Sequence, residues 1–333
     1  MKRMKKVVAL AVVAVMALSM LGACGSKKNT AQSTDAKKQT EATTEKKLNV
    51  VATIYPEYDF LRQIAGDKIN LSLLLPPGGE VHTFDPTTKD LQAITKSDMF
   101  VYVGGDSDEW VEKVLGNLSK KTAVVKLMDQ VKTIEEVEKE GMTPEKEEKE
   151  EKGGKEEKEY DEHVWTDPNN VITICNKLCA KLSKLDPDNA AVYKANTAAY
   201  VKKLQKLDKS FKDVVKTAKR KVIIVGDRFP FAYFAKRYGL DYFAAFPGCS
   251  ADTEPSAKSL SFLIQKTKKE KIPVVFHIEL SNEKVADAIC KETGAKKALL
   301  NAVHNVSKAD FDKGVTYLDL MNHNVDALKE ALN

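Results

Sequence analysis

The stretch "DPDNAAVYKANTAAYVKKLQKLDKSFKDVVKTAK", residues 186–219, decides the fold because it predicts one long helix in the middle of the chain. Its apolar side chains recur at intervals of three, four and seven residues, as one face of a helix requires. The residues on this face are Tyr193, Tyr200, Leu204, Leu207, Phe211, Val214 and Ala218. Asp186-Pro187 is a typical helix start. A helix of about 30 residues spans roughly 45 Å, enough to run along two domains and fix the angle between them.

On both sides of this stretch, short apolar runs alternate with segments of helical pattern. The runs before it are "LNVVATIY", "INLSLLL", "MFVYVG" and "TAVVKL", and those after it are "KVIIVG", "LDYFAAF", "IPVVFHI" and "KKALLNAV". The expected helices between them cover residues 57–65, 86–96, 231–238, 256–269, 284–293 and 317–332. Such alternation predicts α/β units with parallel sheets. We therefore expect an N-terminal lobe over 48–185, a linking helix over 186–219 and a C-terminal lobe over 220–333.

The first residues have the pattern of an export signal. A basic start is followed by an apolar stretch from Val7 to Met20, which is short for a membrane span. It ends in "LGAC", which is typical of a bacterial lipobox and predicts lipidation of Cys24 after removal of residues 1–23. The alternative is an ordinary signal peptide with an incidental cysteine. Residues 24–47 carry no large apolar side chain, which predicts a flexible tether.

The charge balance gives no support to a nucleic-acid-binding protein, and the cysteine content argues against a disulfide-rich scaffold. Loss of residues 1–23 leaves 49 of the 53 Lys and Arg against 48 Asp and Glu, so the basic balance gives no argument for nucleic-acid binding. Beyond Cys24 the cysteines are Cys175, Cys179, Cys249 and Cys290, too few for a disulfide scaffold. Cys175 and Cys179 share one helix face, and we favour a buried pair over a thiolate metal pair. Whether any cysteines pair is left open.

Residues 133–162 break the globular pattern. This segment is rich in Glu and Lys and almost free of apolar side chains, which predicts a solvated insertion in the N-terminal lobe. A collector of cations is the alternative interpretation. It is disfavoured because the lysines dilute the negative field and no histidine lies between Thr133 and Glu162.

Four of the five histidines fall where an α/β protein binds its ligands. Each lies at or beyond the carboxyl end of an expected strand, or at the entry to a helix, and that edge of an open sheet is the usual ligand site. They are His82, His163, His277 and His304. Imidazole with carboxylate suits Zn²⁺ first, and Mn²⁺ or Fe²⁺ when oxygen ligands dominate. The fifth, His323, lies in mid-helix and is expected to be exposed.

The chain resembles the zinc/manganese-type solute-binding lipoproteins of ABC metal importers (cluster A-I substrate-binding proteins) from Leu48 to Asn333. The resembling stretches are "EVHTFDPTTKDLQAITKSDMFVYVGG", "DEHVWTDPNNV", "PFAYFAKRYGL", "TEPSAKSL", "KVADAICKETGAK" and "TYLDLMNHNVDALKEAL". The resemblance implies two (β/α)₄ lobes joined by one long helix, with a metal in the cleft between them. It implies that His82 and His163 match the first two metal ligands. It also implies lipid anchoring on the extracytoplasmic face and delivery to an ABC permease.

The sequence departs from that family at the third ligand. The family has His or Glu at the position of Arg228, and a guanidinium cannot ligate a cation. We expect Arg228 to lie in the cleft as a non-ligand paired with Glu254 or Glu279. The fourth ligand of the family comes from the loop after the last strand, where this chain offers His304 and Asn305. His277 or Glu279, two apart on one strand, is the expected replacement for the third.

A binding protein for metal import is the leading hypothesis, and we expect a monomer without enzymatic activity. A secreted metallohydrolase would need an open coordination position beside a basic carboxylate. The sequence contains neither H-E-x-x-H nor G-x-S-x-G. A metal-dependent adhesin or a binder of chelated metal is the third hypothesis, because an arginine in the cleft suits an anionic ligand. Tight binding of metal alone separates the first hypothesis from the third.

Overall fold

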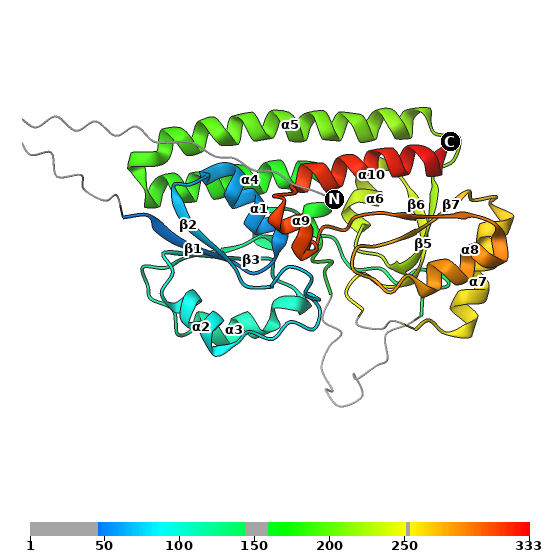
Figure 1. Ribbon diagram of the computed structural model, residues 1–333, viewed down its shortest axis with the longest axis horizontal. Coiled ribbons are helices and arrows are strands. Elements are labelled where there is room, and N and C mark those ends of the chain that lie inside the picture. The colour runs from blue at the N-terminus through cyan, green and yellow to red at the C-terminus, as the bar shows by residue number, and fades with distance from the viewer. Residues whose placement is uncertain (1–45, 144–158, 251–253) are drawn as a thin grey trace, which may run out of the picture. The chain divides into compact units, whose positions relative to one another are not determined.

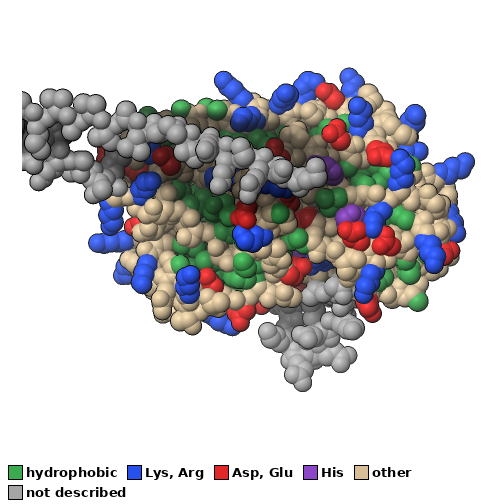
Figure 2. Space-filling model, in the orientation of Figure 1, with side chains coloured by type: hydrophobic (Ala, Val, Ile, Leu, Met, Phe, Trp, Pro, Cys, Tyr) green, Lys and Arg blue, Asp and Glu red, His purple; other side chains and the backbone are tan. Residues whose placement is uncertain are grey.

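The computed structural model describes residues 46–143, 159–250 and 254–333, and Lys46–Asn333 form one compact unit. The expectations for the export signal, for Cys24 and for the tether up to residue 45 lie outside the described residues. Among the described residues, no helix is both long and apolar enough to cross a membrane. In the view of Figure 2, Lys and Arg side chains are scattered around the rim of this face among Asp and Glu.

The N-terminal lobe is built on one parallel sheet in the order β2-β1-β3-β4. Its elements are β1 (Leu48–Ala52), α1 (Tyr55–Ala65), β2 (Ile69–Leu73), α2 (Thr88–Thr95), β3 (Met99–Tyr102), α3 (Glu109–Leu115) and β4 (Ala123–Lys126), with 3₁₀ turns η1 (Asp106–Asp108) and η2 (Met128–Gln130). The helix expected over 86–96 starts two residues later, at Thr88. Thr87 caps this helix by accepting a hydrogen bond from the Asp90 amide, so the helix begins at Thr88.

The C-terminal lobe repeats this design with a parallel sheet in the order β6-β5-β7-β8. Its elements are β5 (Val222–Arg228), α6 (Ala232–Tyr238), β6 (Asp241–Phe246), α7 (Ala257–Lys269), β7 (Val274–His277), α8 (Lys284–Thr293), β8 (Lys296–Leu299), α9 (Lys308–Asp312) and α10 (Tyr317–Leu332). The expected α/β class with two parallel sheets is confirmed.

A long helix passes from one lobe to the other, as Figure 1 shows along the top of the view. This helix is α5 (Ala190–Thr217), preceded by η4 (Val164–Thr166), α4 (Pro168–Leu185) and η5 (Pro187–Asn189). The apolar face predicted for it is buried from Tyr193 to Val214, whereas Ala218 lies just beyond the helix end. Helix α10 lies beside α5. It begins against the N-terminal lobe, where the Tyr317 amide donates to Asp59 of α1, and it ends at the C-terminal lobe, where the Lys219 amide donates to the Leu332 carbonyl.

One apolar core connects the two lobes. It joins the inner faces of both sheets to α4, α5 and α10, and includes Val50, Phe211, Val225 and Leu328. Successive strand residues alternate between this core and smaller outer clusters, because side chains along a strand point to opposite faces. The shared core therefore holds the carboxyl ends of the two sheets in a fixed mutual arrangement.

The ends of the range predicted as a solvated insertion lie against the body. The Thr143 amide donates to the Ala245 carbonyl, and the Glu136 carboxylate accepts from the Gly248 amide. Asp161 and Glu162 are buried. The expectation that residues 133–162 are a solvated insertion is therefore wrong at both ends. Polar groups at the first end pair with the C-terminal lobe, and Asp161 and Glu162 at the second end are buried. Residues 144–158 lie outside the described residues.

The four described cysteines are all free thiols. Cys175 and Cys179 are buried on one face of α4, as the favoured interpretation expects. Burial raises the pKa of the Cys175 thiol well above its ordinary value, so this side chain is neutral and behaves as a small apolar residue.

Candidate metal centre

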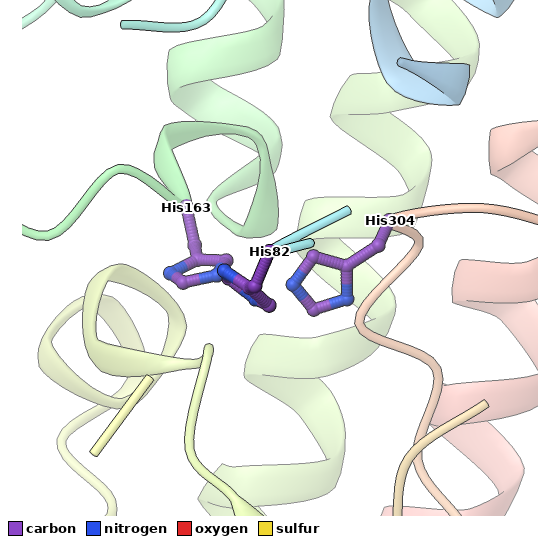
Figure 3. Close-up of side chains that lie close together, drawn as sticks. All are labelled: His82, His163 and His304. Carbon is purple, nitrogen blue, oxygen red and sulfur yellow. The ribbon is translucent and has the colours of Figure 1, made fainter. Parts of the chain in front are cut away.

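Three imidazoles from distant parts of the sequence converge on one point (Figure 3). His82 follows β2, His163 precedes α4, and His304 follows β8. Their ring centroids lie 4.9–5.8 Å apart, and one nitrogen from each ring lies within 4.8 Å of the other two. A tetrahedral zinc ion with Zn–N bonds of about 2.0–2.1 Å separates its nitrogens by roughly 3.3 Å. Small ring rotations are therefore enough to bring the three nitrogens onto one ion.

The inner nitrogens of these rings have no partner in the described part of the chain. The Nε2 atoms of His82, His163 and His304 each have less than 1 Å² of exposed surface and no hydrogen bond. A buried polar atom without a partner costs about 1–3 kcal/mol, so three at one point need an explanation. A bound cation accounts for all three, because each Nε2 lone pair can serve as a ligand.

The outer nitrogen of His82 contacts a short polar relay. Its Nδ1 lies 3.0 Å from Ser107 Oγ in η1. The Ser107 hydroxyl and amide both donate to the Glu162 carboxylate. Because the hydroxyl proton goes to Glu162, its oxygen accepts from Nδ1–H of His82. This tautomer leaves the Nε2 lone pair of His82 for a cation.

His163 is fixed by the residue two positions before it. Asp161 Oδ1 lies 3.1 Å from His163 Nδ1 and accepts from the His163 amide at 2.8 Å. One carboxylate oxygen thus sets both the backbone and the ring of His163. Trp165 packs edge-on against His163 and His304, and its indole N–H donates to the Ala302 carbonyl. The wall that Trp165 forms beside these two imidazoles is therefore aromatic and buried.

His304 is held by Glu279 across a strained turn. Glu279 Oε1 lies 3.2 Å from His304 Nδ1, and the two carboxylate oxygens accept from the amides of Ala302 and His304. Between these amides lies Val303, whose φ of +65° is costly for a β-branched residue. We infer that the carboxylate of Glu279 holds the turn in the conformation that points His304 inward.

The electrostatic surroundings favour neutral rings at two positions. Burial and nearby positive charges lower the pKa of His82 and His304 well below 6.5. Burial by itself would lower the pKa of His163, but the carboxylates of Asp161, Glu162 and Glu136 together raise it. Burial raises the pKa of Glu162 to about 7. His82 and His304 are therefore neutral and ready to bind a cation, whereas any proton on His163 must leave before that ring binds one.

Replacing Glu279 with glutamine is expected to lower zinc affinity by about 10- to 100-fold, the usual effect of losing a carboxylate behind a ligating imidazole. The substitution removes the negative charge that faces His304 Nδ1 and keeps the size of the side chain at position 279. Competition against a chromophoric chelator measures the affinity. Glu283→Gln is the matched control, because Glu283 contacts Lys297 and His277 away from the three rings. Equal affinities for wild type and Glu279→Gln would contradict this role for Glu279.

Arg228 lies at the end of β5 and pairs with Glu80, not with Glu254 or Glu279 as expected. Its two terminal nitrogens lie 3.2 and 3.0 Å from the two Glu80 carboxylate oxygens. The Glu279 carboxylate is already occupied by two amides and an imidazole. Glu80 reaches Arg228 from the loop after β2 of the N-terminal lobe.

The structure does not bring His277 or Glu279 into the group of three nitrogens, which corrects the expectation that one of them replaces the third ligand. Strand β7 ends at His277, so the two residues do not share a strand face. His277 Nδ1 lies 3.1 Å from the Ile278 carbonyl, and Glu279 supports His304 instead. His323 is exposed on α10, as predicted.

A second group of metal-binding residue types shares His163. Glu162, His163 and Cys249 each offer one atom within 4.8 Å of the others. Glu162 already accepts two hydrogen bonds from Ser107, and His163 Nδ1 is occupied by Asp161. Burial raises the pKa of the Cys249 thiol well above its ordinary value, which keeps it protonated. The three imidazoles are the stronger candidate.

The sequence analysis missed four residues of the site. Ser107, Asp161 and Glu162 touch the imidazoles from behind, and Glu80 pairs with Arg228. Asp161 and Glu162 stand at the end of a Glu-rich segment, so their composition did not distinguish them from its other acidic residues. Their position directly before His163 is the one signal that could have separated them from it.

Comparison with known proteins gives consistent matches. A family model described as zinc-uptake complex component A, periplasmic (ZnuA), matches residues 50–331. The chain is 38% identical over 313 residues to the high-affinity zinc uptake system protein ZnuA of Bacillus subtilis, covering 94% of each chain. It is 35% identical to the zinc-binding lipoprotein AdcA of Streptococcus pneumoniae, covering 85% of this chain but 56% of AdcA. The Zn(II)-bound ZnuA-like domain of that AdcA superposes with a TM-score of 0.70 at 33% identity, covering 86% of this chain and 99% of the domain.

Proposed function

The chain belongs to the family of periplasmic zinc-uptake complex components A, and we propose that it uses His82, His163 and His304 to capture a divalent metal outside the cytoplasm. It is a solute-binding protein with zinc as the favoured cargo. The observation that carries the residue assignment is the set of three buried Nε2 atoms without partners, each opposite an Nδ1 that contacts an oxygen. Ligating histidines usually have this arrangement.

The three-imidazole donor set favours zinc over manganese. Imidazole suits Zn²⁺, whereas Mn²⁺ prefers carboxylate, carbonyl and water ligands, and divalent affinity generally rises from Mn²⁺ toward Zn²⁺. The nearby carboxylates of Asp161 and Glu279 contact the Nδ1 side of the rings rather than the point where the Nε2 atoms meet. Fe²⁺ lies between the two ions in this order.

Zinc should bind at least about 100-fold more tightly than manganese, by the same order of affinities. Native mass spectrometry of the chain from residue 25 on should show one bound Zn²⁺, and titration with Mn²⁺ in competition gives the ratio. Equal affinity for the two ions would mean that oxygen ligands dominate the site. Failure to take up any divalent ion would overturn the proposed function.

We propose that the protein is lipid-anchored at Cys24 and delivers its metal to an ABC permease. The family is extracytoplasmic, and one similar protein is named a lipoprotein. The "LGAC" stretch and the apolar-poor segment after it support an anchor followed by a tether. The proposed state is a monomer, since the three imidazoles come from one chain.

The two other function classes find less support. For an enzyme, the site would need a water-exposed coordination position beside a free basic carboxylate, whereas the three Nε2 atoms are buried. For a binder of an anionic chelate, Arg228 would have to be available, but its guanidinium is engaged by Glu80. We therefore propose capture of the metal ion alone, without catalysis.

A further inference from the structure

The side chains of Arg228 and Glu80 join the two lobes beside the imidazoles. Arg228 ends β5 in the C-terminal lobe, and Glu80 lies in the loop after β2. The guanidinium meets both carboxylate oxygens at 3.2 and 3.0 Å, and it also lies 3.4 Å from the Ser250 carbonyl. The Arg228 side chain is 12% exposed and that of Glu80 is 42% exposed. A two-pronged contact of this kind is the most directional form of an ion pair.

The same carboxylate contacts the backbone of a proposed ligand. Glu80 Oε1 accepts from the His82 amide at 3.3 Å, so a single side chain connects Arg228 to the residue that presents an imidazole. We propose that the Arg228–Glu80 ion pair is a clasp that holds the His82 loop (residues 76–82) against the C-terminal lobe and thereby slows release of the bound metal. The inference rests on the proposed function.

A second set of contacts fixes the start of the same loop. The Asn305 side-chain amide donates to the carbonyls of Pro76 and Gly79, and the Gly78 amide donates to the Val306 carbonyl. These contacts come from the segment that carries His304. The loop therefore has one attachment at its start and another, through Glu80, at the end that carries His82. Opening the second attachment frees His82 without detaching the whole loop.

The clasp is partly exposed to solvent, whereas the Nε2 atoms of the three imidazoles are buried. A cavity is lined by both Glu80 and Arg228, together with Asp227, Ser281 and Asn282, and by none of the three histidines. Water can hydrate both charges there when the pair separates, which lowers the cost of separation. The three Nε2 atoms stay buried until the loop moves.

Simple electrostatics predicts the opposite effect for Arg228. Its positive charge is close enough to lower the pKa of His82 and His304, so it also repels a cation bound between them. If charge alone mattered, removing Arg228 would slow metal release, and removing the negative charge of Glu80 would speed it. The clasp instead requires both removals to speed release. The sign of the Arg228 effect therefore separates the two explanations.

The test measures zinc release from the mature full-length chain by stopped-flow mixing with excess chelator. Arg228→Gln and Glu80→Gln keep side-chain size and should each release zinc about 3- to 10-fold faster, the range of a partly exposed two-pronged pair. The double variant should be no faster than the faster single variant, because both remove one interaction. Equilibrium affinity should fall by a similar factor, because the dissociation constant is the ratio of the release rate to the capture rate and the clasp is proposed to act on release.

Arg62→Gln is the matched control. Arg62 also reaches the other lobe, where its guanidinium lies 2.9 Å from the Val315 carbonyl, but it does not touch the His82 loop. It should change the release rate by less than about 2-fold. Equal acceleration by Arg62→Gln would show general loosening of the lobes and overturn the clasp.

Slower release from Arg228→Gln, unchanged release from both single variants, or fully additive effects would each overturn the proposal as well. Melting temperatures of the zinc-free variants close to that of the wild type exclude a folding defect. If the wild-type chain takes up no zinc, the proposed function fails. If it binds zinc and the variants release it at the wild-type rate, the clasp alone fails.

Discussion

Replacement of any one of His82, His163 or His304 with alanine is expected to lower zinc affinity by more than about 100-fold, because loss of a ligand exceeds the 10- to 100-fold effect of losing its supporting carboxylate. Each variant leaves only two of the three imidazoles at the site. Isothermal titration with zinc, or competition with a chelator for the tightest cases, measures the change.

His277→Ala and His323→Ala are the matched controls and should retain wild-type affinity. His277 contacts the Ile278 carbonyl, and His323 is exposed on α10. Because His163 is fully buried, circular dichroism must first show that His163→Ala folds. Wild-type affinity in two of the three site variants would refute the three-imidazole centre. A large loss in His277→Ala would restore His277 as a ligand.

Zinc is expected to stabilise the folded chain by about 4 kcal/mol at a free concentration near 1,000 times its dissociation constant, because the ion binds the native state and not the unfolded one. For a chain of this size the melting temperature should rise by roughly 8 °C. Differential scanning calorimetry with and without zinc measures this zinc-dependent increment in melting temperature. His82→Ala is the control that should lose most of it. An unchanged melting temperature in wild type would refute tight binding.

This zinc-dependent increment should shrink as the pH falls through the raised pKa of His163. A raised folded pKa means that proton binding at His163 stabilises the zinc-free protein, fully below about 6.5 and no longer once the pH rises above the folded pKa. The zinc-bound protein cannot hold that proton. His82 and His304 stay neutral in the zinc-free fold because their pKa is lowered, so they leave the increment unchanged near neutrality. An increment that grows on acidification would contradict the role of His163.

The sequence predicted most of the site because strand ends are visible in it. His82, His163 and His304 each follow a strand or precede a helix, and the carboxyl ends of parallel strands share one edge of a sheet. His277 met the same criterion and lies outside the group. Which strand ends face the other lobe depends on the angle between the two sheets, and no periodicity within a segment encodes that angle.

The supporting residues were hidden for a different reason. Ser107 lies in a 3₁₀ turn and Glu80 in a loop, where polar side chains are ordinary. Their roles come from contacts with residues 55 and 148 positions away in the chain. The pairing of Arg228 with Glu80 rather than Glu279 was decided by occupancy, since the Glu279 carboxylate is engaged by the turn around Val303.

The sequence by itself determined the two α/β lobes, the long helix between them and the choice of imidazole as the metal-binding group. These are local properties, because apolar periodicity, capping residues and side-chain chemistry act within a few residues of the chain. Tertiary structure alone decided that three of the histidines meet, that each has an oxygen at Nδ1, and that Arg228 spans the lobes. The core shared through α4, α5 and α10 fixes the two sheets relative to each other, and that fixed angle places His82, His163 and His304 on one point.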